Sequence, residues 1–208
     1  MATRVCLEVG ARRCFASALD WPGWCRSGKG EDEALATLAG YSARYASVAA
    51  GARIPLARDA ATFEVVERVE GNATTDFGAP AIVAASERQP VDATEARRLA
   101  TLVQACWATL RRAADAAPAE LRKGPRGGGR DRDAIVDHVY DAEAAYFRKL
   151  GLRLPKSTPA ERRTALAARL TEPWDEASAP EGTWPLRYAV RRVGWHALDH
   201  AWEIEDRS

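Results

Sequence analysis

Hydrophobic and polar residues alternate in the first part of the chain, which predicts β-strands there. Residues 4–9 (RVCLEV) alternate in this way, as the two faces of a half-buried strand require. After a short connection, residues 14–19 predict a second strand that forms a hairpin with the first. Residues 62–69 (TFEVVERV) predict a third strand, and residues 79–85 are a candidate for a fourth.

A stretch with a helical period separates these strands. Apolar residues recur at helical spacing between residues 31 and 49. Asp32 and Glu33 lie in the first turn, where the helix dipole favours negative charge. Residues 1–88 therefore predict a small α+β unit. A junction is predicted at residues 89–94, because the pattern is helical from there to the end of the chain.

Four stretches with helical spacing follow this junction. They cover residues 93–115, 132–150, 158–171 and 183–206. Asp92 caps the first stretch, Gly151 ends the second, and Thr158 opens the third with Pro159 directly behind it. Together they predict an all-α up-down four-helix bundle over residues 92–208, so the expected fold is an α+β unit followed by a helical bundle.

Composition is that of a globular protein. Of the 208 residues 47% are hydrophobic, and 30 basic against 29 acidic side chains leave a net charge of +1. This balance argues against nucleic acid as a partner. We expect a cytoplasmic protein without a membrane partner, because no apolar run is long enough to span a bilayer and the N-terminus lacks the apolar region of a signal peptide. The four cysteines are expected to be reduced thiols that fill the core.

A basic, glycine-rich loop connects the first two helices of the predicted bundle. Its charged residues include Arg122, Lys123, Arg126, Arg130 and Arg132. The loop is the best candidate for contact with an anionic substrate or a nucleic acid, but it has no interleaved aromatic residues. We therefore favour a solvated connection.

The three histidines of the chain all lie in the helical half. His196 and His200 are four residues apart, so both imidazoles project from one face of the last helix. His138 lies at the edge of the apolar stripe of the second helix. Two imidazoles at this spacing and a third from a neighbouring helix predict a metal site that leaves coordination positions open. The alternative is three unrelated histidines with ordinary hydrogen bonds.

Three carboxylates stand close to these histidines in the sequence. They are Asp141, Asp199 and Glu203. Each is a candidate to accept a hydrogen bond from a ring N–H and so to orient a metal ligand. The sequence assigns no catalytic and no substrate-binding residue.

The helical half resembles the DinB-like (YfiT-like) superfamily of metal-dependent four-helix-bundle proteins. The resemblance rests on the histidine in DAIVDHVYDAEAAYFRKLG and on H-x-x-x-H in GWHALDHAWEIEDR, which occur on the second and fourth helices as in that superfamily. It implies that His138, His196 and His200 bind one divalent metal ion. Zinc is the default for three imidazoles, with nickel, iron and manganese as alternatives.

The same resemblance implies an activity. Members with known activity use the metal to activate a low-molecular-weight thiol, such as mycothiol or bacillithiol. The expected function is therefore thiol-dependent S-transfer or isomerisation of a small-molecule electrophile. Two alternatives stay open: a non-enzymatic binding or scaffold protein with a structural metal, and a hydrolase that uses metal-bound water.

Residues 5–49 show a weaker resemblance to the HicB-like fold, carried by FASALDWPGWCRSGKGEDEALATLAGYSARY. Units of this fold often bind a partner protein, but we favour a scaffold or substrate-covering role for the N-terminal unit. The resemblance transfers no catalytic residue.

Tyr188, Trp195 and Trp202 recur every seven residues on the last helix, roughly opposite its core stripe. A helix that is apolar on both sides is normally covered on both sides. We therefore expect Trp195 and Trp202 to be mostly buried, with at least one of them in contact with residues 1–90 or with a second chain. A symmetric homodimer through this face is the first alternative. In the second, the helix is rotated and both rings lie in grooves of the bundle.

Overall fold

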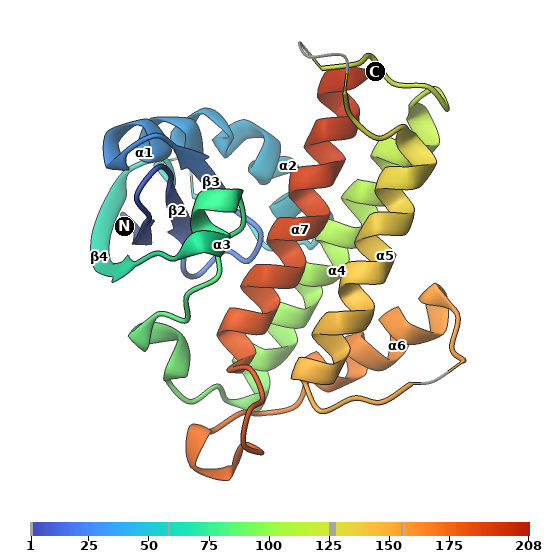
Figure 1. Cartoon of the computed structure of the whole chain (residues 1–208). Helices are drawn as coiled ribbons and strands as arrows, with labels where there is room; N and C mark the ends of the chain where they lie inside the picture. Colours follow the sequence, from blue (N-terminus) through green and yellow to red (C-terminus); the bar gives the residue numbers. More distant parts are fainter. Residues whose placement is uncertain (1, 58, 125–127, 155) are drawn as a thin grey trace.

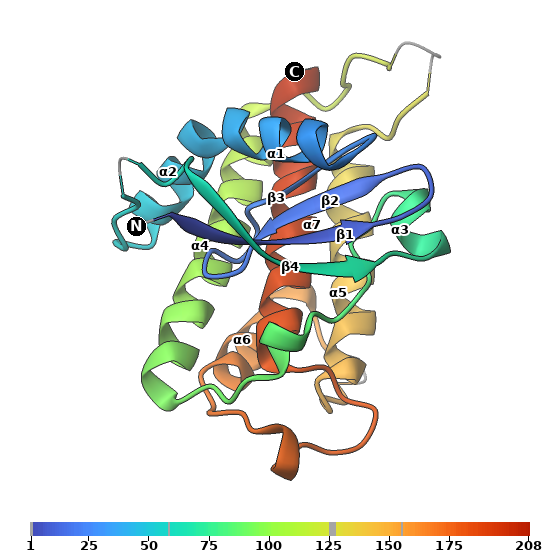
Figure 2. The ribbon, with the colours of Figure 1, turned by 90° about the vertical axis from the view of Figure 1, so that its left-hand side faces the viewer.

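The N-terminal region of the chain forms a four-stranded sheet. The computed structural model describes residues 2–57, 59–124, 128–154 and 156–208. The strands are β1 (Thr3–Val9), β2 (Cys14–Ala18), β3 (Cys25–Gly28) and β4 (Phe63–Glu70), in the order β3-β2-β1-β4. Strands β1, β2 and β3 are antiparallel neighbours, whereas β4 runs parallel to β1 (Figure 2).

Two helices, α1 (Glu31–Gly40) and α2 (Ser42–Gly51), connect β3 to β4. The sequence predicts one continuous helix over these residues, but the backbone leaves helical geometry at Tyr41. The Tyr41 ring packs against the ring of Trp202 at a centroid distance of 4.9 Å. The break therefore falls where the N-terminal region meets the last helix.

The prediction of a strand at residues 79–85 is wrong. Residues 79–84 are irregular, and the short 3₁₀ helix η1 (Ala85–Arg88) follows them. The backbone N–H groups of Ala81 and Ile82 donate to the carboxylate of Glu8. Because side-chain acceptors satisfy these donors, the segment has no need of a neighbouring strand. The sequence also gives no sign of β3 or of the short helix α3 (Ala73–Phe77).

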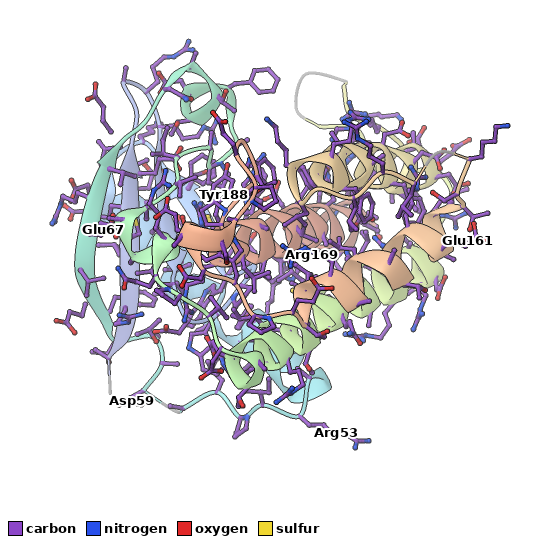
Figure 3. The ribbon with its side chains drawn as sticks, turned by 90° about the horizontal axis from the view of Figure 1, so that it is seen from below. Arg53, Asp59, Glu67, Glu161, Arg169 and Tyr188 are labelled. Atoms are coloured by element: carbon purple, nitrogen blue, oxygen red, sulfur yellow. The ribbon has the colours of Figure 1, made fainter. Side chains whose placement is uncertain are left out.

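Four long helices make up the rest of the chain (Figure 1). They are α4 (Ala93–Ala116), α5 (Arg132–Lys149), α6 (Pro159–Leu170) and α7 (Leu186–Arg207), close to the predicted ranges. Helix α7 packs on α4 and α5, and α6 lies against α4 (Figure 3). The predicted caps are present at Asp92, which accepts from the N–H of Thr94, and at Thr158, which forms a capping box with Glu161.

The sheet side of α7 is covered by the N-terminal region. Trp195 and Trp202 are 5% and 2% exposed, and Trp195 meets the ring of Phe15 edge-on at 6.0 Å. Tyr188 donates a hydrogen bond to the carbonyl of Ala81. The prediction that residues 1–90 bury these tryptophans is confirmed. The same contacts cover, within one chain, the face that the homodimer alternative uses.

One continuous cluster of buried side chains joins the two predicted units. It includes Val5 and Trp24 from the N-terminal region and Leu99, Leu186 and Trp202 from the helices. In the part of the chain that the structure describes, no helix combines the length and the apolar character needed to cross a membrane.

Candidate metal centre

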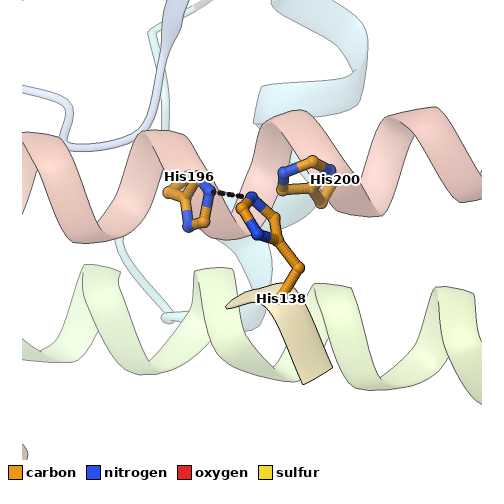
Figure 4. Close-up of side chains that lie close together, drawn as sticks. All are labelled: His138, His196 and His200. Atoms are coloured by element: carbon orange, nitrogen blue, oxygen red, sulfur yellow. Dashed lines mark hydrogen bonds between the residues drawn. The ribbon is translucent and has the colours of Figure 1, made fainter. Parts of the chain in front are cut away.

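The three histidines converge between α5 and α7 (Figure 4). One ligand atom from each of His138, His196 and His200 lies within 4.8 Å of the others. The Nε2 atoms of His138 and His196 are 3.3 Å apart. The structure thus brings together the three residues that the sequence singles out, and the cluster can hold a metal ion.

An apolar cluster shared by α5 and α7 lies close to the histidines in the chain. Ile135 and Val139 flank His138 on α5, and both are fully buried against Ala201 and Ile204 of α7. These contacts set the register between the two helices. On α7 itself, the four-residue spacing places His196 and His200 on neighbouring turns, with ring centroids 4.8 Å apart.

The distance between the ring nitrogens fits a tetrahedral metal centre. Two imidazole nitrogens bound to zinc at about 2.0–2.1 Å, with a tetrahedral angle between them, lie about 3.3–3.4 Å from each other. The Nε2 atoms of His138 and His196 are 3.3 Å apart. The spacing of this pair therefore fits two ligands of one ion, and the ligand atom of His200 lies within 4.8 Å of both.

Burial keeps the imidazoles in the form that binds a metal. The pKa of His196, which is 7% exposed, is lowered well below its usual value, first by burial and then by repulsion from His200 and His138. Burial and the charge of His200 also lower the pKa of His138. Both rings are thus neutral near neutral pH, and a neutral imidazole is the metal ligand.

Glu203 orients His200. Its carboxylate oxygen lies 2.8 Å from His200 Nδ1, and this hydrogen bond lowers the pKa of Glu203. Since Nδ1 is engaged, Nε2 of His200 is the nitrogen left for a metal. A carboxylate behind a ligating histidine fixes both the ring orientation and the tautomer.

The other two carboxylate candidates are placed differently. Asp199 forms an ion pair with Arg26 of β3 at 2.8 Å, on the side of α7 that faces the sheet. The negative charge of Asp141 acts on His138 and offsets a small part of the lowering of its pKa. Of the three candidates, Glu203 is the one that forms a hydrogen bond with a histidine ring in the described part of the chain.

The protein's own thiols are buried and unreactive. All four cysteines are free and buried, as the sequence predicts. Burial raises the pKa of Cys6 and of Cys25 to about 12. A thiol with such a pKa stays protonated, so it is a poor nucleophile and a poor metal ligand.

Two residues beside the centre escaped the sequence analysis. Arg192 lies one turn before His196 on α7 and is only 8% exposed. It donates to the carbonyl of Pro80 at 2.7 Å and to the hydroxyl of Tyr146 at 3.4 Å. The ring of Tyr146 lies 6.0 Å from that of His196. The four-residue step from Arg192 through His196 to His200 is the signal that could have placed Arg192 on the same face.

The basic loop before α5 is largely tied to the protein's own acceptors. Lys123 pairs with Asp131, and Arg132 pairs with Asp133. Arg126 lies outside the described residues. These pairings agree with a connecting role rather than with an open anion site.

Comparison of the chain with protein-family models, curated proteins and solved structures finds no match. The function therefore has to be argued from the geometry of the centre.

Proposed function

We propose that this protein is a metal-dependent enzyme of the DinB-like type, in which α4–α7 form the four-helix bundle and three histidines hold one divalent metal. The observation that carries the proposal is the convergence of His138, His196 and His200, with two ring nitrogens 3.3 Å apart. No fourth His, Cys, Asp or Glu of the described chain joins this group. Three protein ligands leave a position for an exchangeable ligand, as catalytic sites do.

The reaction we propose is transfer of a low-molecular-weight thiol to a small electrophile, or a thiol-assisted isomerisation. A divalent metal, with zinc as the default, supplies the positive charge that lowers the pKa of a thiol at the site. In the transfer, the sulfur bonds to the electrophilic carbon, the leaving group departs with its electron pair, and the thiol proton passes to solvent. An external thiol such as mycothiol or bacillithiol fits this reaction, because the chain's own cysteines are buried and protonated.

The chain's residues have separate tasks in this proposal. His138 and His196 lie close enough to share one ion, and their lowered pKa values keep them neutral. Glu203 holds His200 in a single orientation. The N-terminal region covers the opposite side of α7 through Trp195 and Trp202, which holds the helix in place.

The test is an assay of free thiol. Zinc-loaded protein, incubated with a small thiol and a panel of electrophiles, is expected to consume thiol faster than the metal-free protein. The variant His196→Ala should lose this rate, whereas Asp133→Asn, at the exposed start of α5, should keep it. A metal-dependent hydrolysis without thiol loss would favour the hydrolase alternative, and metal binding without either reaction would favour the scaffold.

A further inference from the structure

Two adjacent arginines of α7 are both buried, but their partners differ in charge. Arg191 is 6% exposed and makes a bidentate pair with Glu87, at 2.6 and 2.9 Å. Arg192 is 8% exposed, but its acceptors are a backbone carbonyl and the hydroxyl of Tyr146, both neutral. The Nε of Arg192 has no hydrogen-bond partner. A buried charge without a counter-charge is costly, so this guanidinium calls for an explanation.

The nearby carboxylates do not supply the missing charge. Glu87 is taken by Arg191, and Glu143 of α5 is taken by Arg163 at 2.8 and 2.9 Å. In the described parts of the chain, no carboxylate forms an ion pair with Arg192. The guanidinium lies over the rings of Trp195 and Tyr146, at 5.0 and 5.6 Å from their centroids, and this cation–π contact offsets only part of the cost.

Arg192 and Tyr146 lie on the histidine side of the α5–α7 contact. Arg192 precedes His196 by one helical turn, about 5.4 Å along the axis, and the ring of Tyr146 lies edge-on to the ring of His196. Burial raises the pKa of Tyr146, so its hydroxyl stays protonated and can donate a hydrogen bond to an acceptor. One charged and one neutral donor therefore meet beside the metal ligands.

The charge at the metal centre also favours an anionic ligand. Three neutral imidazoles leave the two positive charges of a divalent ion unneutralised, and Arg192 adds a third. Glu203 is the carboxylate that contacts the histidines, and Arg207 shares it at 2.6 Å. An occupied centre is therefore electropositive, and a ligand with negative charge is favoured over a neutral ligand of the same shape.

We propose that Arg192 and Tyr146 form a carboxylate-binding subsite beside the metal, and that the exchangeable ligand is a small thiol that carries a carboxylate. The proposal rests on the proposed function for the thiol part alone. The sulfur occupies the open metal position, while the carboxylate accepts from the guanidinium of Arg192 and the hydroxyl of Tyr146. Arg192 is thus a binding residue that selects the ligand by charge.

The test compares two thiols of equal size on cobalt-substituted protein. 3-Mercaptopropionate and its amide, 3-mercaptopropanamide, differ in charge but have the same number of heavy atoms. Each is titrated into the protein, and binding is measured from the thiolate-to-cobalt charge-transfer band. We expect the carboxylate to bind about tenfold or more tightly than the amide, as a charge-assisted pair requires. This first comparison uses the unaltered chain and does not depend on how a variant folds.

The variants assign the preference to a residue. Arg192→Met should remove most of this preference and leave only the part that the positive charge of the metal contributes. Tyr146→Phe should reduce the preference in part. Arg187→Met is the matched control on the same helix, because Arg187 pairs with Glu95 and should leave the preference intact. Equal affinities in the unaltered protein, or a preference that is undiminished in Arg192→Met, would overturn the subsite.

A separate readout distinguishes the two proposals. If neither thiol gives a charge-transfer band, the thiol reaction is wrong. The binding of propionate, which has no sulfur, is then measured by isothermal titration calorimetry. Binding that is present in the unaltered protein and weakened about tenfold in Arg192→Met supports the carboxylate subsite on its own, and no binding overturns it.

Discussion

Nε2 of His138 on α5 and Nε2 of His196 on α7 lie 3.3 Å apart, although the two residues are 58 positions apart in the chain. Neither helix alone defines this spacing. It depends on how Ile135 and Val139 of α5 pack against α7, because these side chains set the register that aligns the two rings. The centre is therefore sensitive both to the loss of a ligand and to small shifts between the helices.

Removal of one imidazole should abolish stoichiometric metal binding. His138→Ala, His196→Ala and His200→Ala each leave two ligands, and two imidazoles hold a divalent ion far more weakly than three. Elemental analysis of purified protein should give about one metal per chain for the unaltered protein and a small fraction of that for each variant. Asp133→Asn, at the exposed start of α5, is the control. Unchanged metal content in the His196→Ala protein would show that the ion binds elsewhere.

Glu203→Ala should weaken metal binding without abolishing it. The carboxylate fixes the His200 ring through a 2.8 Å hydrogen bond, and loss of such a partner typically costs about 10–100-fold in metal affinity. The control is Glu205→Ala, since Glu205 is exposed on the same turn of α7. Competition with a chromophoric chelator measures both affinities. Equal losses in the two variants would point to a general effect of charge at the end of the helix.

The metal-free protein should lose stability as the pH falls below about 6.5. The pKa values of His196 and His138 are lowered in the folded state, so the unfolded chain takes up protons first as the pH falls. Stability then rises with pH in this range, by up to about 1.4 kcal/mol per pH unit for each such group. Urea unfolding of the metal-free protein between about pH 5 and pH 8 measures the slope.

The variant His196→Asn identifies the source of this pH dependence. Asparagine does not titrate, so the slope in the same range should decrease. The remaining slope includes His138, whose pKa is lowered chiefly by burial and also by His200, and towards pH 5 the carboxylates with lowered pKa values such as Glu203. A slope that is unchanged in His196→Asn would mean that protonation of His196 does not oppose folding.

The histidine cluster was predictable because helix geometry acts over short distances in sequence. A four-residue step fixes the relation between His196 and His200, and the apolar stripes indicate which edge of α5 carries His138. The partner of the Asp199 side chain was not predictable in this way. It lies three residues from His196, yet its partner is Arg26 of β3, which only the docking of the sheet brings near.

The same limit applies to Arg192 and to the segment after β4. An arginine on a helix is normally exposed, and the burial of Arg192 depends on Trp195, Tyr146 and the chain around Pro80. The apolar stretch at residues 79–85 has the composition of a strand. Glu8, which lies more than seventy positions earlier, takes its N–H groups instead. Both outcomes depend on tertiary contacts, which leave no local pattern in the sequence.

A pair of glycines allows the N-terminal region to approach α7, and Gly194→Ala should disturb this contact. A Cβ at Gly194 would lie 3.0 Å from the backbone nitrogen of Gly23 and 3.1 Å from the carbonyl carbon of Pro22. These are backbone atoms, so they cannot rotate away as the end of a side chain can. Alanine raises helix propensity by about 1 kcal/mol, but overpacking of a well-packed contact costs about 1–3 kcal/mol. We expect a net loss in the free energy of unfolding.

The matched control is Gly40→Ala, at the end of α1, where an added Cβ meets nothing within 4 Å. Both changes replace a helical glycine with alanine, so they share the gain in propensity and differ in the space around the methyl group. Urea unfolding should show Gly40→Ala to be as stable as the unaltered protein or more stable, and Gly194→Ala to be less stable. Because Trp195 follows Gly194 directly and packs on Phe15, a displaced N-terminal region should also shift tryptophan fluorescence to longer wavelength. Equal stability of the two variants would show that α7 and residues 22–23 can separate without cost, and the close approach would then not hold the two regions together.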